Sequence, residues 1–249
     1  MSESLRFYAL AVPAVILLGL SKGGFAGMGA LSLPILAMVV SPVRAAAILL
    51  PILIVQDVVS VWAFRRDWDG FVLAWMLPGA VIGIALAYLF AAHVDPDAVL
   101  GLVGAISIVF GLYRLWLERR GGDVPAARSP GWVGTLAGVV SGFTSQIAHA
   151  GQPPFQLWVL PRRLPRDVLV GTTAIFFAAT NWLKVPAYWA LGQFTRENLT
   201  TAALLMPVAI LSTFAGVWLV RRVSPQRFYG AIYVLMIVVG VKLVWDAVV

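Results

Sequence analysis

The chain alternates long apolar segments with short polar loops. Six of these segments reach the roughly 20 residues that a helix needs to cross a hydrocarbon core about 30 Å thick. They cover residues 45–64, 71–92, 98–117, 168–191, 199–220 and 228–248. The pattern predicts an all-α, polytopic membrane protein.

Two further apolar segments are each interrupted by a polar, glycine-containing loop. The first loop, residues 19–30, holds five glycines and Lys22 between the short apolar arms 5–18 and 31–40. The second loop, residues 141–154, lies between the arms 132–140 and 155–160. Each arm is predicted to be too short to cross, so each pair is predicted to be a broken or re-entrant hairpin, at about 5–40 and about 132–160. Irregular backbone at membrane depth is tolerated only where it is buried in protein or lines a cavity. The loops are therefore candidate binding elements.

The second half of the sequence repeats the first. Glycine, proline and tryptophan positions recur at fixed shifts, for example Gly101, Gly111 and Trp116 as Gly230, Gly240 and Trp245. We predict a first repeat at 1–117, a cytoplasmic connector at 118–130 and a second repeat at 131–249. A repeat of this length, with discontinuous helices, is typical of a secondary-transporter half.

The loop charges predict how the two repeats are oriented. Lysine and arginine number two at 65–66, four at 114–128, three at 162–166 and three at 221–227, but one at 44, none at 93–97 and one at 196. Cytoplasmic loops carry the excess of Lys and Arg. Placing the rich loops inside gives three spans and one hairpin per half, hence inverted repeats with both termini periplasmic. Parallel halves of four spans would put one rich loop on the wrong side.

The composition narrows the function classes. The chain is 61% hydrophobic and only 12% charged, against about 25% charged residues in soluble domains. It has no cysteine and two histidines, so we expect no disulfide, no thiolate chemistry and no metal site. The net charge of +7 lies in loops between apolar segments and is read as a topology signal rather than nucleic-acid binding. Enzyme motifs are absent from the sequence, and we predict no enzymatic activity and no cofactor.

The polar residues at predicted membrane depth are the candidate site. An ionised side chain at this depth is costly and needs a partner or water, so Lys22 is the strongest candidate for contacting an anion. Hydroxyl, amide, imidazole and ammonium donors in the second half suit the same ligand. The predicted substrate-binding residues are Lys22, Gly23, Gly24, Ser145, Gln146, His149, Gly151, Gln152, Asn181 and Lys184. The predicted coupling or gating residues are Gln56, Asp57 and His149.

Structural alternatives remain open for several of these residues. Lys22 could extend to the interface from a loop, and His149 could bond only a loop carbonyl. Asp57 could form an ion pair with Lys184. If it does not, Lys184 helps to hold the anion, and Asp57 or His149 is the candidate for proton coupling.

The sequence resembles the sulfite exporter TauE/SafE family of membrane permeases. The matching motifs are residues 19–25 with Gly27, Gly29 and Pro34, then Gln56-Asp57 with Trp62 and Arg65, residues 147–154, and residues 181–186. The resemblance implies a multi-pass protein of the bacterial inner membrane that exports sulfite or organosulfonates. Family members more often have consecutive glycines where this chain has Gly151-Gln152, which bears on which anion fits.

We therefore predict a secondary carrier of a small sulfur-containing anion, working by alternating access as one half rocks against the other. A passive anion channel is the first alternative, and a transition-metal or cation permease and a non-transporting scaffold are weaker ones. The sequence leaves the anion, the coupling ion and the choice between monomer and homo-oligomer open.

Overall fold

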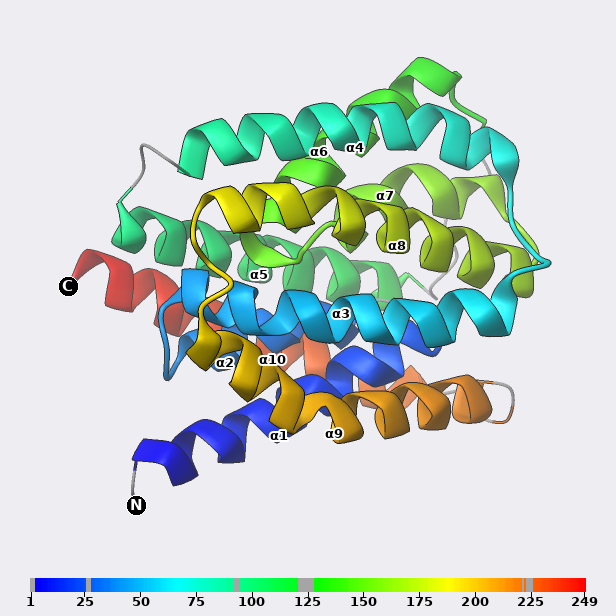
Figure 1. Ribbon diagram of the computed structural model, residues 1–249. Helices are drawn as coiled ribbons and strands as arrows, with labels where there is room; N and C mark the ends of the chain where they lie inside the picture. Colours follow the sequence, from blue (N-terminus) through cyan, green and yellow to red (C-terminus); the bar gives the residue numbers. More distant parts are fainter. Residues whose placement is uncertain (1–2, 26–27, 92–94, 121–127, 221, 223–225) are drawn as a thin grey trace.

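The protein is a bundle of helices, seen in a computed structural model (Figure 1) that describes residues 3–25, 28–91, 95–120, 128–220, 222 and 226–249. The long helices are α1 (Glu3–Lys22), α3 (Pro42–Phe64), α4 (Gly70–Ala91), α5 (Pro96–Arg119), α6 (Gly131–Ala148), α8 (Arg166–Ala190), α9 (Arg196–Val220) and α10 (Gln226–Val248). The short ones are η1 (Met28–Leu31), α2 (Ser32–Ala37), α7 (Gln152–Val159) and η2 (Leu160–Arg162). Six of the described helices, α1, α3, α4, α5, α8 and α9, are long and apolar enough to cross a membrane. The prediction of an all-α polytopic membrane protein is confirmed.

In each of the two interrupted segments, the helix before the loop is longer than the sequence suggested. We expected the first arm, residues 5–18, to be too short to cross, and this is wrong, because α1 continues as one helix of 20 residues to Lys22. Likewise α6 runs 18 residues, well past the predicted arm 132–140. The second member of each pair is short, with six residues in α2 and eight in α7. Most of the expected connector, residues 121–127, lies outside the described residues.

Proline and capping side chains fix where several helices begin. The Ser41 hydroxyl accepts from the backbone N–H of Arg44 at 3.3 Å, and Pro42 follows as the first helical residue of α3. The carboxylate of Asp95 accepts from the N–H of Asp97 at 3.1 Å, with Pro96 starting α5. A side-chain cap satisfies an N–H that has no partner within the helix, and proline at the first position loses no hydrogen bond.

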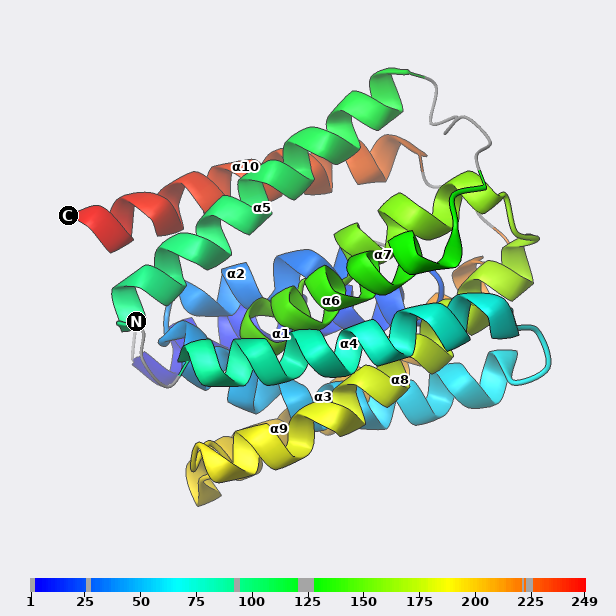
Figure 2. The ribbon, with the colours of Figure 1, turned by 90° about the horizontal axis from the view of Figure 1, so that it is seen from above.

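Corresponding helices of the two halves run in opposite directions. Figures 1 and 2 show that α1 and α3 begin at the end of the bundle where α10 ends, whereas α6 and α8 begin at the opposite end. The same opposition holds for α4 against α9 and for α5 against α10. Each short helix, α2 or α7, turns back toward the end from which its long partner started.

Glycines bring three pairs of helices into close contact, and each pair joins one half of the chain to the other. In α4 and α6, a Cβ added to Gly83 would overlap the carbonyl oxygen of Val139, and one added to Gly142 would overlap that of Ala80. Gly23, directly after α1, meets the backbone of α9 in the same way. The third pair, α5 and α10, approaches through Gly104 and Gly240. Small residues at helix interfaces allow such close approach in membranes.

The packing divides the buried residues into two apolar clusters. The smaller cluster is built from α4, α7 and α8 and contains Val72, Met76, Phe155, Trp158 and Phe176. The larger one is built mainly from α1, α2, α3, α5, α9 and α10. Helix α4 therefore packs with helices of the second half, and α9 packs with α1 and α3 of the first.

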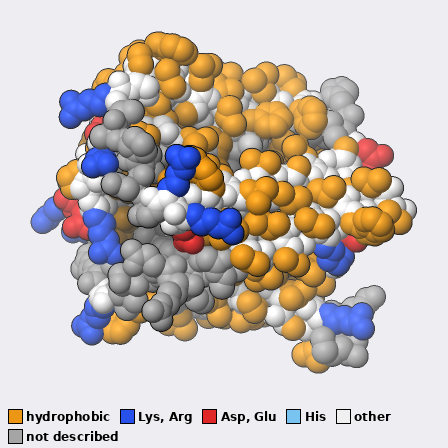
Figure 3. All heavy atoms as spheres, turned by 180° about the vertical axis from the view of Figure 1, so that it is seen from behind, with side chains coloured by type: hydrophobic (Ala, Val, Ile, Leu, Met, Phe, Trp, Pro, Cys, Tyr) orange, Lys and Arg blue, Asp and Glu red, His pale blue; other side chains and the backbone are white. Residues whose placement is uncertain are grey.

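The outer surface is apolar around the middle, and most of its cationic side chains gather at one end (Figure 3). Four arginines stack on tryptophans three or four residues earlier in their chain segments, with ring-centre distances of 3.9–5.5 Å. These pairs are Trp62–Arg65, Trp116–Arg120, Trp158–Arg162 and Trp218–Arg222. All four lie at the ends of α3, α5, α7 and α9, which point to the same end of the bundle. We call it the arginine-rich end.

Candidate functional site: a polar cavity between the two glycine-containing loops

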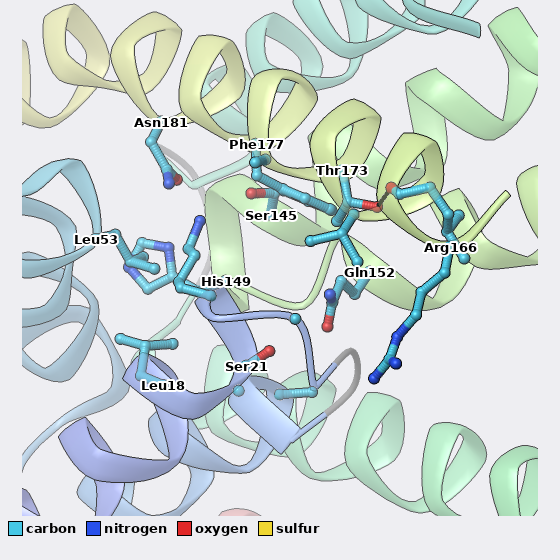
Figure 4. A pocket seen from close by; sticks show the side chains of 17 residues that line it. Leu18, Ser21, Leu53, Ser145, His149, Gln152, Arg166, Thr173, Phe177 and Asn181 are labelled. Carbon is cyan, nitrogen blue, oxygen red and sulfur yellow. Dashed lines mark hydrogen bonds between the residues drawn. The ribbon is translucent and has the colours of Figure 1, made fainter. Parts of the chain in front are cut away.

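A cavity of about 150 Å³ lies between the two loops (Figure 4). Its walls come from α1 and the segment after it, from α3, from the α6–α7 break and from one face of α8. The lining residues include Leu18, Ser21, Lys22, Gly24, Leu53, Ser145, His149, Gln152, Arg166, Thr173, Phe177 and Asn181. The cavity thus has polar groups set in a mainly apolar wall, which is the usual make-up of a small-molecule site.

Lys22 reaches the cavity as the last residue of α1 and forms an ion pair with Asp57 of α3. The second carboxylate oxygen of Asp57 accepts from the Asn181 amide on α8 at 2.6 Å. The side chain of Lys22 is 13% exposed and that of Asp57 only 1%. The lysine therefore faces the cavity, and its counter-ion lies behind it. The Lys22 ammonium also lies 5.6 Å from the ring centre of Phe177. Lys22 therefore does not extend to the interface.

Lys184 forms a second buried cluster, with His149 and Ser145. Its ammonium donates to the Ser145 carbonyl and hydroxyl, both at 3.2 Å, and lies 2.8 Å from His149 Nδ1. The other ring nitrogen, Nε2, lies 2.9 Å from the Ala46 carbonyl. A neutral imidazole with its proton on Nε2 satisfies both contacts, because Nδ1 then accepts and Nε2 donates. The ion pair considered between Asp57 and Lys184 is not formed, since Asp57 pairs with Lys22.

The backbone at His149 explains how its ring reaches this cluster. His149 ends α6 in the left-handed region at φ 50°, with its N–H bonded to the Ser145 carbonyl at 3.1 Å. A non-glycine residue rarely adopts this conformation, and such residues are often found at functional sites. Gly24, at φ 124°, makes the corresponding turn after α1 and also lines the cavity.

The structure brings six of the ten predicted binding residues to the cavity wall: Lys22, Gly24, Ser145, His149, Gln152 and Asn181. The other four lie behind it. Gly23 faces α9, and a Cβ there would overlap the backbone of Gly216. Gly151 packs under Ser141 and Phe177, Gln146 accepts through its carbonyl from Tyr188, and Lys184 is fully buried.

Of the predicted coupling residues, His149 lines the cavity, whereas Asp57 and Gln56 lie behind its wall. Asp57 supports Lys22, and Gln56 donates to the Ala209 carbonyl of α9 at 3.3 Å. The amide oxygens of Gln56 and Gln146 are buried without a hydrogen-bond partner. Burying an acceptor without a donor is costly. A conformational change that gives either amide oxygen a hydrogen-bond donor would therefore be favourable.

One face of α8 runs along the cavity. Its lining residues, Arg166, Leu169, Val170, Thr173, Ala174, Phe177 and Asn181, recur at helical spacing. The next residues on this face are Lys184 and Tyr188, which are 0% and 3% exposed. Tyr188 stacks on His149, with ring centres 6.2 Å apart, and donates to the Gln146 carbonyl at 2.9 Å. The cavity is thus lined from the arginine-rich end to Asn181 and closed beyond it.

Sequence reasoning missed Arg166, Thr173 and Phe177 as lining residues. The available signal was their spacing from Asn181, because residues 4, 8 and 15 positions earlier fall on the same side of a helix. Arg166 was counted only as a loop charge.

The charges of the cavity favour an anion. The described groups in and behind its wall include two lysines, Lys22 and Lys184, against the single carboxylate of Asp57, with Arg166 as a further cation. Among the described residues, no three His, Cys, Asp or Glu side chains come together as a metal site.

Comparison with known proteins gives one match. The family model described as Sulfite exporter TauE/SafE matches residues 11–243 of the chain. No curated protein matches, and no solved structure matches.

Proposed function

The chain belongs to the sulfite exporter TauE/SafE family, a family of membrane permeases, and we propose that it is a secondary transporter that exports a small organosulfonate or sulfite. The observation that carries this proposal is the position of Lys22. Its ammonium faces a mainly apolar cavity and is held by Asp57 from behind, so that its exposed side can contact an oxyanion.

The size of the cavity favours an organic anion over a bare inorganic one. A water molecule needs about 10–15 Å³ on this measure of volume, and the cavity offers about 150 Å³. Its walls include Leu18, Leu53 and Phe177, which would contact an apolar carbon skeleton. The sulfonate group would lie against Lys22, with the amides of Asn181 and Gln152 as further donors.

We propose that the arginine-rich end faces the cytoplasm of the bacterial inner membrane, so that both termini are periplasmic. The loop charges and the four Trp–Arg pairs support this orientation. The cavity would then be open inward, and His149, Lys184 and Tyr188 would form the closed outer side. A fluorescent or enzymatic reporter fused to the C-terminus tests the orientation, and a cytoplasmic signal would contradict it.

The helix packing suggests which bodies move in alternating access. The halves are supported as inverted repeats by the opposite directions of their helices, but they are not separate bodies. We infer that α4 moves with α6, α7 and α8, and that α9 moves with α1, α2 and α3. The substrate would bind between these two groups, because Lys22 belongs to one and Asn181 to the other.

Coupling to protons is proposed for the Lys22–Asp57 pair. The pair lies at the cavity wall, where an anion would compete with the Asp57 carboxylate for the Lys22 ammonium. The neutral His149 is held by Ala46 and Lys184 and would respond if Lys184 moved.

The test is anion flux in proteoliposomes, with sulfite, sulfoacetate, taurine, sulfate and acetate as substrates. Lys22→Gln removes one charge from the cavity, and Lys242→Gln removes one from an exposed pair with Asp246. A lost bond to a charged group is worth about 1.5–3 kcal/mol, so we expect Lys22→Gln to weaken anion affinity by roughly 10- to 150-fold. Lys242→Gln should match the wild type, and equal behaviour of the two variants would reject the role of Lys22.

A passive anion channel is the second candidate, because it would share the cationic wall. Saturable flux and counterflow, in which unlabelled anion on one side drives labelled anion from the other, distinguish a carrier. Flux that is linear in concentration without counterflow would support the channel.

A further inference from the structure

Arg166 is a cation of the cavity wall that the proposed binding step does not use. It is the first residue of α8 and is exposed, whereas Asn181 at the other end of the lining is 2% exposed. Figure 4 shows the guanidinium extending away from Asn181, on the side where the Gln152 amide lies. Arg166 therefore lies at the mouth of the cavity, at its arginine-rich end.

Helix geometry separates Arg166 from the inner cation. Lys22 contacts the ring of Phe177, which comes 11 residues after Arg166 on α8. At 1.5 Å per residue this is about 16 Å along the helix axis. Because the Arg166 guanidinium also extends away from Asn181, the two cations lie at different depths along α8 and define two successive positions.

The inner cation is already paired and largely buried. The charge of Lys22 is compensated by Asp57, and its side chain is only 13% exposed. Lys22 is thus poorly placed to attract an anion from solution, although it is well placed to bind one that has entered the cavity.

Arg166 has the features that an entry position needs. Its planar guanidinium can bind a carboxylate or sulfonate through two parallel hydrogen bonds. The first turn of α8 adds the positive end of the helix dipole.

We propose that Arg166 is the entry residue of the transporter, where the anion binds first before it moves along α8 to Lys22. The inference rests on the proposed anion transport, and it assigns to Arg166 an effect on the rate at which the anion is captured. Removing Arg166 should slow capture of the anion from the side that the mouth faces, while leaving the inner site and the conformational step unchanged.

The experiment compares Arg166→Gln, Arg166→Lys and Arg163→Gln in uniformly oriented proteoliposomes. Arg163 is exposed, lies three residues away and is outside the cavity lining, so it controls for the loss of one charge at this end. Initial rates are measured with substrate on either side and over a series of salt concentrations. Thermal melting and size-exclusion profiles verify that each variant is folded.

For Arg166→Gln we expect KM to rise about three- to tenfold for substrate on the mouth side, with kcat unchanged. With substrate on the opposite side, kcat/KM should fall by the same factor, because release of the anion past Arg166 is the reverse of its capture and a substitution cannot change the transport equilibrium. The salt dependence of the mouth-side KM should weaken. Arg166→Lys keeps the charge but not the paired hydrogen bonds, so it should fall between Arg166→Gln and the wild type, and Arg163→Gln should match the wild type.

An unchanged mouth-side KM in Arg166→Gln would overturn the entry role, as would an equal change in Arg163→Gln or a loss of kcat alone. These outcomes leave the proposed function standing, because the wild type still transports. Absence of saturable anion flux in the wild type would instead reject the proposed function, and the entry role with it.

Discussion

The buried pair of Lys22 and Asp57 predicts a strong and specific coupling between two substitutions. Asp57→Asn leaves the Lys22 ammonium without its carboxylate. Lys22→Gln leaves a carboxylate that is 1% exposed and keeps its hydrogen bond from the Asn181 amide but loses its ion pair. Removing one partner of a buried pair costs about 3–5 kcal/mol. For a protein of this size that is a fall in Tm of roughly 6–20 °C. Because Lys22 is 13% exposed, we expect the fall in Tm for Asp57→Asn to lie toward the lower end of this range.

The double variant Lys22→Gln/Asp57→Asn carries no buried charge at these positions, and its two amides can bond each other. The double variant avoids the penalty of a buried charge without its partner, so we expect it to recover most of the lost Tm. Transport should stay lost, because the ammonium that we propose as the contact for the anion is gone. The assay is a double-mutant cycle of thermal melting in detergent, with flux measured on the same four proteins.

Added substrate separates the two single variants. In Asp57→Asn the freed ammonium faces the cavity, so a bound sulfonate can replace the missing carboxylate and raise Tm more than it does in the wild type. In Lys22→Gln no such gain is expected. Additive losses in the double variant, or an equal anion response in all four proteins, would refute the assignment of Asp57 as the counter-ion of the binding lysine.

Three further outcomes are expected. Gly83→Ala should lower Tm, because its Cβ would overlap the Val139 carbonyl. Gly101→Ala is the control, since its Cβ would make only an ordinary contact, and it should leave Tm unchanged or raise it. Equal Tm values in the two variants would contradict the close α4–α6 packing. The double variant Gly101→Cys/Ala247→Cys should form a disulfide, because a Cβ at Gly101 would lie 3.4 Å from that of Ala247 and the chain has no native cysteine. Transport should survive oxidation if α5 and α10 move together. Inhibition that is reversed by reduction would show that they do not. His149→Ala removes an acceptor of the buried Lys184 and should cost about 1–3 kcal/mol in chemical unfolding, and an unchanged unfolding midpoint would argue against that contact.

The sequence was sufficient for the architecture because membrane helices follow from local composition. The segments expected at 45–64 and 199–220 begin only three residues later than α3 and α9 and end at the same residues. Periodicity and length cannot show where a helix ends at a polar residue that has a buried partner. That is why α1 was expected to stop at residue 18, although it continues to Lys22 and its ion pair with Asp57.

The candidate site could be predicted only in part, for a physical reason that Gly23 and Arg166 illustrate. A glycine allows close approach of a ligand or of another helix, and the sequence does not distinguish the two; Gly23 faces α9. Arg166 follows a loop in the sequence, and only the packing of α8 against the cavity reveals it as a wall residue. The partners of Lys22 and Lys184 are 35 and 39 residues away, beyond any local pattern.

Three of the stacked Trp–Arg pairs also have a consequence for the surrounding lipid. Trp62, Trp116 and Trp218 are exposed beside their arginines, so in the proposed orientation their rings would lie at the headgroup level and set one common depth for α3, α5 and α9. A bilayer that is too thick or too thin therefore strains the whole bundle at once, because no single helix can tilt without leaving this plane. Transport should consequently depend on the thickness of the bilayer.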